Sequence, residues 1–106
     1  MAGRLTNPAA AWFLAKSGGS PIALRDRAGW YVETVEGTGG VAATLAAAGL
    51  EALRRTVQSS GDRSAALDLL AADALVTLAL LAQAETDPAG LAAFAHDWRD
   101  EGVVPT

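Results

Sequence analysis

Asp73 is the residue whose surroundings most strongly suggest chemistry. It lies within the run AALDLLAADALVTLALLAQAE (residues 65–85), where apolar side chains dominate and water should be scarce. A carboxyl group in such a place can serve as a general acid or base, because desolvation disfavours its charged form. An arginine partner or exposure to solvent is the ordinary alternative, since burying an unpaired charge is costly. Asp73 is therefore only a weak candidate for catalysis, because it has neither a nucleophile nor a metal to work with.

A small-molecule site around Asp73 is an alternative function. It would combine Asp73 with Thr77, one helical turn further on, and with Arg54 or Arg55 as a positively charged neighbour. Helical bundles often hold ligands between their helices, so a binding protein or an enzyme of this kind remains open.

Metal and cofactor chemistry find little support in the residue types. The chain has no cysteine and a single histidine, His96, so a metal centre of cysteine or histidine ligands within one chain is excluded. No carboxylate-rich loop typical of calcium sites is present, and we predict neither a metal nor a cofactor. We expect His96 on the exposed side of its helix, opposite Phe94 and Trp98, which disfavours an acid–base pair with Asp73.

The arginines raise the question of nucleic acid. The segments 40–59 and 63–85 are spaced like a helix-turn-helix, but the second is too apolar to lie in a DNA groove. The net charge of −4 and the pI of about 4.7 also repel a phosphate backbone. A DNA-binding regulator is a second alternative, with nucleic acid disfavoured as a partner. The arginines concerned are Arg25, Arg27, Arg54, Arg55 and Arg63.

The composition predicts one helical domain over residues 1–106. A second core would be too small to be stable in a chain of 106 residues. The 25 alanines and 14 leucines favour helices, whereas only 8 residues are valine or isoleucine. We attribute the alanine excess and the preference for arginine over lysine to a bacterial-type genome composition, not to function.

Three dipeptides mark helix starts: Asn7-Pro8, Ser20-Pro21 and Asp87-Pro88. In each, a residue that caps helix N-termini precedes proline, which is favoured at the first helical position. With glycines and Asp62 as further boundaries, we predict helices over residues 8–16, 21–36, 40–59, 63–85 and 88–101. The small residues at 46–49 should let another helix come close.

The fourth helix should lie at the centre of the fold. On a wheel of about 100° per residue, leucines form one side and Asp68 marks the outer side. A helix that is apolar around most of its circumference normally has neighbours on several sides. We therefore predict an all-α compact bundle of about five helices with the fourth, residues 63–85, central. The predicted inner side consists of Leu67, Leu70, Ala74, Leu78 and Leu81.

Surplus apolar residues lead to the principal functional hypothesis. Trp30 falls off the predicted inner side of its helix, and Trp12 and Phe13 are further apolar groups beyond the predicted inner sides, more than one small core can hide. We predict a small non-catalytic helical protein–protein interaction or assembly module that forms a homodimer, with these three aromatic residues as partner-binding candidates.

A cytoplasmic location without a membrane span completes the prediction. The longest apolar stretch, residues 74–84, is interrupted by Thr77 and Gln83. It is shorter than the roughly 20 residues needed to cross a bilayer.

Overall fold

Helices make up all the regular structure in the part of the chain that the structure describes. The computed structural model describes residues 7–35, 39–59 and 61–98. It confirms the predicted all-α class, while the predicted ends of the second and fifth helices, at residues 36 and 101, lie outside the described residues. The elements are α2 (Pro8–Lys16), α3 (Ile22–Thr34), α4 (Gly40–Gln58), α5 (Arg63–Thr86), the short 3₁₀ turn η1 (Pro88–Gly90) and α6 (Leu91–Trp98).

Side-chain caps start α2 and α5 as predicted. The Asn7 side-chain oxygen accepts hydrogen bonds from two backbone N–H groups, at 3.0 and 3.2 Å. The Asp62 carboxylate accepts one at 2.9 Å. Both satisfy N–H groups that a helix start leaves without a partner. Ser20 provides no such cap, because Pro21 itself holds the N-cap position of α3, and Asp87 caps only the 3₁₀ turn that precedes α6.

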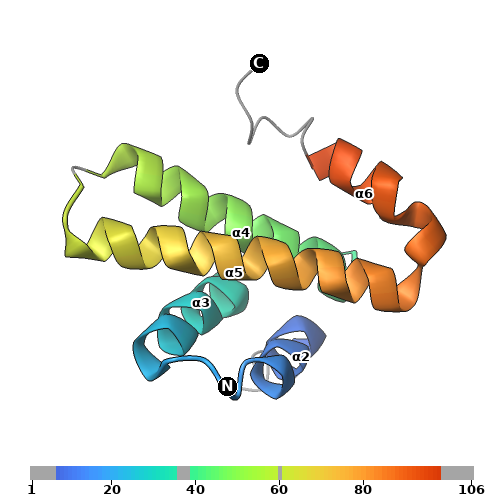
Figure 1. Cartoon of the computed structure of the whole chain (residues 1–106), viewed down its shortest axis with the longest axis horizontal. Coiled ribbons are helices and arrows are strands. Elements are labelled where there is room, and N and C mark those ends of the chain that lie inside the picture. The colour runs from blue at the N-terminus through green and yellow to red at the C-terminus, as the bar shows by residue number, and fades with distance from the viewer. Residues whose placement is uncertain (1–6, 36–38, 60, 99–106) are drawn as a thin grey trace.

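α4 and α5 form an antiparallel pair that runs across the molecule (Figure 1). Gly49 lies at a close approach of the two helices. A Cβ atom added to it would lie 3.3 Å from Cγ2 of Val76 and 3.5 Å from the Val76 backbone nitrogen. Only small residues fit at such a distance, which confirms the expectation for residues 46–49.

α5 is the central element, as predicted for the fourth helix. It packs along α4 and against α3, η1 and α6. α2 and α3 lie on one side of the α4–α5 pair, and α6 folds back on the other (Figure 1). The core is thin because most of its members are alanines. Its largest fully buried side chains are Tyr31, Val32, Leu45 and Leu75.

The rotation of α5 about its own axis differs from the prediction. Leu70 and Leu81, expected inside, are 54% and 42% exposed. The predicted inner side was wrong for these two leucines, although Leu78 does pack against the core. It was chosen by side-chain size, whereas α5 packs on α4 and α3 mainly through alanines. The side that is buried repeats every three or four residues and consists of Ala65, Asp68, Ala71, Ala72, Leu75, Ala79 and Ala82.

Candidate functional site

Asp68, and not Asp73, is the buried carboxylate of α5. Asp68 is only 8% exposed, whereas Asp73 lies on the exposed side of the helix. Because five residues turn a helix by about 140°, turning the alanines inward carries Asp68 into the core and Asp73 towards solvent. The expectation of a water-poor environment around Asp73 is therefore wrong, and so is the placement of Asp68 on the outer side.

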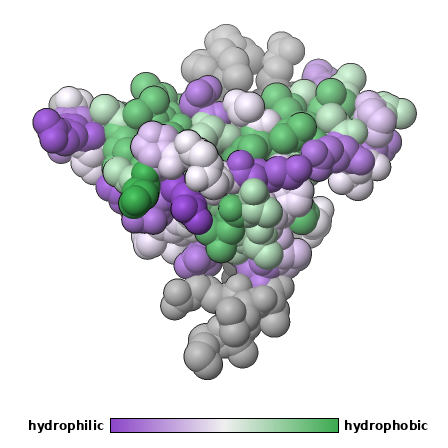
Figure 2. All heavy atoms as spheres, turned by 60° about the horizontal axis from the view of Figure 1, so that its bottom comes forward, coloured by the Kyte–Doolittle hydropathy of each residue, from purple (hydrophilic) through white to green (hydrophobic). Residues whose placement is uncertain are grey.

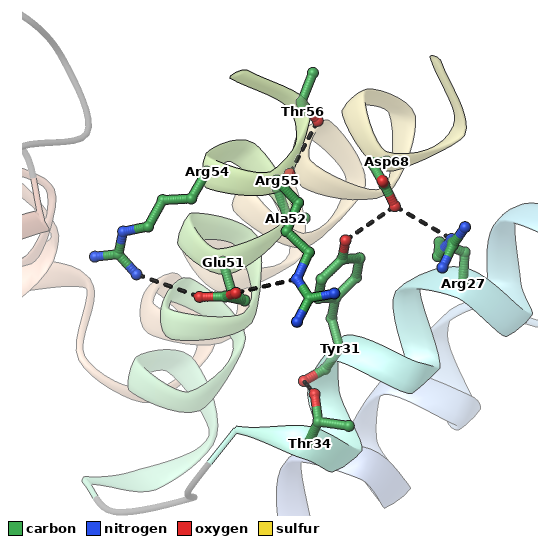
Figure 3. A network of polar contacts seen from close by, with 9 residues as sticks. All are labelled: Arg27, Tyr31, Thr34, Glu51, Ala52, Arg54, Arg55, Thr56 and Asp68. Carbon is green, nitrogen blue, oxygen red and sulfur yellow. Dashed lines mark hydrogen bonds and ion pairs between the residues drawn. The ribbon is translucent and has the colours of Figure 1, made fainter. Parts of the chain in front are cut away.

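Asp68 joins α5 to α3 through two contacts (Figure 3). Its Oδ1 atom accepts a hydrogen bond of 2.9 Å from the Tyr31 hydroxyl group and lies 3.2 Å from Nε of Arg27. Arg27 also donates a hydrogen bond of 3.1 Å to the Ser64 hydroxyl group. Arg27 and Tyr31 are four residues apart, so their side chains lie on the same face of α3. The buried charge is thus both paired and hydrogen-bonded, as a stable core requires.

Tyr31 is the protonated partner in this cluster. Its side chain is fully buried, and burial is the largest cause that raises its pKa from 10.0 to about 12. The hydrogen bond to Asp68 and the negative charge of that carboxylate act in the same direction, while Arg55 and Arg27 oppose them. The hydroxyl group therefore keeps its proton and acts as a donor. Because Tyr31 is closed off from solvent, the cluster has the properties of a structural anchor.

Arg55 covers the aromatic residues at the edge of the cluster. Its guanidinium carbon lies 5.1 Å from the centre of the Trp30 ring and 6.0 Å from that of Tyr31. The two rings meet edge to face, with their centres 5.0 Å apart. Such cation–π contacts contribute about 0.5–1 kcal/mol each at exposed sites. They fix Trp30 against α4 without burying it.

The four residues predicted to bind a ligand do not form one site. The Thr77 hydroxyl group donates to the backbone carbonyl of Asp73 at 2.9 Å, so these two lie together on the exposed side of α5. Arg54 and Arg55 lie on α4, where both pair with Glu51, at 3.5 and 3.1 Å. Arginines at these positions serve an ion pair within one helix instead of balancing Asp73.

The three predicted partner-binding aromatic residues have different environments. Trp30 is 43% exposed, as a surface anchor needs to be. Trp12 is half-buried and lies under the Lys16 ammonium group, 5.4 Å from the ring centre. Phe13 is only 2% exposed and belongs to the core, so its placement among the partner-binding residues is corrected. The prediction failed at Phe13 because α2 is too short for its inner side to be read from spacing.

Shallow grooves flank Trp30 on the outer side of α3. The larger has a volume of about 500 Å³ and lies between Trp30 and the exposed residues Leu14 and Ile22. The smaller, of about 300 Å³, lies between Trp30 and Leu67. Asp73 lines neither groove. On this side of the molecule, apolar groups reach the surface in separate patches between polar ones (Figure 2).

The sequence interpretation also missed the exposed leucines on the outer side of α5. Leu69 and Leu70 are 51% and 54% exposed, and Leu81 is 42% exposed beside the half-buried Leu80. We call these four residues, with Asp73 and Thr77 between them, the leucine stripe. The regular recurrence of alanine on the opposite side of α5 is the signal that would have indicated it, because a helix that packs through alanines leaves its leucines outside.

Other functional features are weaker. His96 is exposed, as predicted, and among the described residues no three His, Asp or Glu side chains lie close enough to hold a metal ion. Within the same part of the chain, α5 alone is long and apolar enough to cross a membrane, with a mean hydropathy of 2.0 and 39% of that window buried in the fold. The core helix of a folded domain meets the same criteria, so the chain is not a clear membrane protein.

No protein-family model matches the chain, and no curated protein or solved structure matches it either.

Proposed function

We propose that this protein is a small, non-catalytic helical interaction or assembly module of the cytoplasm that forms homodimers through the leucine stripe of α5. The observation that carries the proposal is the exposure of Leu69, Leu70 and Leu81, each between 42% and 54%, along one side of the central helix. Exposed leucines grouped on one side of a helix are typical of interaction sites.

The gain from covering the stripe supports a weak dimer. Burying a leucine completely is worth about 1.5–3 kcal/mol, so each half-exposed leucine contributes about 1 kcal/mol. Three such leucines on each of two copies give about 6 kcal/mol, with smaller contributions from Leu80 and its neighbours. Association costs at least about 4 kcal/mol in lost freedom of motion. The three leucines alone leave a net gain of about 2 kcal/mol. Dimerisation at about 100 µM corresponds to about 5.5 kcal/mol, so we expect Leu80 and its neighbours to contribute roughly 3–4 kcal/mol more.

The polar residues support a non-catalytic role. The Asp68 carboxylate is occupied by Tyr31 and Arg27, and Tyr31 is fully buried. A catalytic group has to reach its substrate, which this cluster does not allow. Asp73 is exposed, and the hydroxyl group nearest to it in sequence, that of Thr77, is used in a bond to the backbone. These contacts do not support a ligand site around Asp73.

Sedimentation equilibrium of the full chain tests the proposal. The wild-type protein should dimerise as its concentration rises to about 100 µM. Leu70→Glu should remain a monomer, because it places a charge in the stripe. Val57→Glu is the matched control: Val57 is 75% exposed but lies on α4, so dimerisation should be unchanged. A wild-type monomer throughout this range, or a dimer indifferent to Leu70→Glu, would contradict the proposal.

A further inference from the structure

The leucine stripe is symmetric about position 75. Two leucines lie five and six residues before this position and two lie five and six residues after it, while Asp73 precedes it and Thr77 follows it by two residues each. Leu75 itself is fully buried and points to the opposite side of the helix. The symmetry extends outwards to Ala66 and Ala84, each nine residues away. The stripe therefore has the same sequence of residue types, apart from the exchange of Asp73 and Thr77, in either direction.

These residues occupy one face of α5. On a wheel of about 100° per residue they fall within an arc of about 120°, directly opposite the buried alanines. Of the helices that the structure describes, none crosses the near side of α5 in Figure 1. Ala66 is exposed and Ala84 half-buried, and both lie on the midline of the arc, where small side chains let a second helix approach closely.

A surface with this symmetry is complementary to itself in one orientation. When two helices pack antiparallel around a two-fold axis, each residue meets the level of the residue equally far beyond the axis on the other helix. Leu69 and Leu70 of one copy then reach the level of Leu81 and Leu80 of the other. Asp73 reaches the level of Thr77, a neutral side chain whose hydroxyl group keeps its bond to the backbone of its own helix.

We propose that two copies of this chain dock α5 against α5 in antiparallel orientation, with the two-fold axis at the level of Leu75 and with Asp73 of each copy at the level of Thr77 of the other. This inference rests on the proposed function, because it specifies the partner and geometry of the same stripe.

Charges at the ends of the stripe favour the antiparallel orientation. Arg63 and Asp87 each lie twelve residues from position 75, so Arg63 of one copy reaches the level of Asp87 of the other. The helix dipoles also oppose each other in this arrangement. A parallel pair in register would instead place Asp73 beside Asp73 and Arg63 beside Arg63. The antiparallel pair separates the two Asp73 residues by about 6 Å along the axis.

Disulfide formation between two cysteine variants tests the geometry. The chain has no cysteine, so Ala66→Cys and Ala84→Cys each introduce the only thiol. In the proposed dimer, residue 66 of one copy faces residue 84 of the other, within the reach of about 7 Å that a disulfide allows between Cα atoms. Two residues 66 lie about 27 Å apart along the axis.

The two variants are mixed in equal amounts, one of them labelled with a heavy isotope, and oxidised gently at a concentration at which the wild type dimerises. Mass spectrometry then counts mixed and self-paired disulfides. Random collisions would give about half mixed product. We expect mixed product to exceed the sum of both self-paired products at least about tenfold, because the self-paired thiols are out of reach. Ala11→Cys, at an exposed position on α2, gives the collisional background.

The possible outcomes distinguish a failure of the proposed dimer orientation from a failure of the proposed function. Self-paired disulfides in excess would show a parallel pair and overturn the inference. Cross-linking no faster than at Ala11→Cys, with a wild-type protein that still sediments as a dimer, would place the interface elsewhere and overturn the inference while leaving self-association intact. A wild-type monomer would remove the proposed function and the inference together.

Discussion

Asp68→Ala and Asp73→Ala test which aspartate of α5 contributes to the stability of the fold. The structure points to the buried Asp68, whereas the sequence drew attention to Asp73. Asp68→Ala removes the acceptor of the Tyr31 hydroxyl group and the partner of Arg27. A buried hydroxyl group left without an acceptor costs about 1–3 kcal/mol. Arg27 loses less, because its side chain is 32% exposed and can turn to water. The greater helix propensity of alanine returns about 0.5 kcal/mol.

The net loss for Asp68→Ala is then about 2 kcal/mol of unfolding free energy. For a domain of this size that corresponds to a fall in Tm of about 10 °C. Asp73→Ala is the matched control, since it makes the same substitution on the same helix. Asp73 is exposed, so the unfolding free energy of this variant should equal that of the wild type or exceed it by at most about 0.5 kcal/mol.

Both variants are compared with the wild type by urea and thermal unfolding, followed by circular dichroism. Dilute protein is used so that self-association does not add to the measured stability. If Asp73→Ala destabilises the protein as much as Asp68→Ala, the rotation of α5 described above is wrong. The same follows if Asp68→Ala costs nothing.

Three further predictions concern Tyr31, Gly49 and Asp73. Burial, and after it the bond to Asp68, raises the pKa of Tyr31 to about 12, so the folded state holds this proton more tightly than the unfolded state. The resulting stabilisation should be present below pH 10.0, and the unfolding free energy should fall by about 2–3 kcal/mol as the pH rises towards 12. Phenolate absorbance of this single tyrosine and alkaline unfolding measure it, and Tyr31→Phe should remove that pH dependence. Gly49→Leu should destabilise the protein by about 2 kcal/mol or more in urea unfolding, because its side chain would force α4 away from Val76; unchanged stability would contradict the close approach. Asp73→Asn should lower the Kd of the dimer two- to threefold in sedimentation at low salt. It removes the repulsion between the two Asp73 carboxylates of the proposed dimer, about 0.5 kcal/mol at roughly 8 Å. A weaker dimer would contradict the proposed register.

The helix boundaries were predictable because they depend on neighbouring residues alone. The Asn7 and Asp62 side chains cap the helices that their positions indicated. Ser20 was predicted to cap in the same way and does not, since α3 begins one residue later than the proline rule implied. A central fourth helix was also predictable, because a helix with few polar residues needs neighbours on several sides.

The orientation of α5 was not predictable by weighing hydrophobicity, because both sides of this helix are apolar. What decides between them is the partner helix: Gly49 on α4 lets Leu75 and Val76 of α5 come close, and the alanines on either side of Leu75 are buried with it. That information is distributed over two segments of the sequence, and neither contains it alone. The buried cluster of Asp68 was missed for the same reason, since an aspartate next to alanines looks like a surface residue until the alanines are known to be inside.

An interior lined with alanine has an unusual consequence for how this sequence can change over evolutionary time. Most domains lose stability when a bulky core residue is trimmed, but Ala72, Ala79 and Ala82 have almost nothing left to trim. Damage comes from larger residues, or from glycine, which costs about 1 kcal/mol in a helix interior, so a saturation mutagenesis survey should find these positions restricted to alanine and serine. The leucines facing outwards should vary freely wherever pairing of two copies is not under selection.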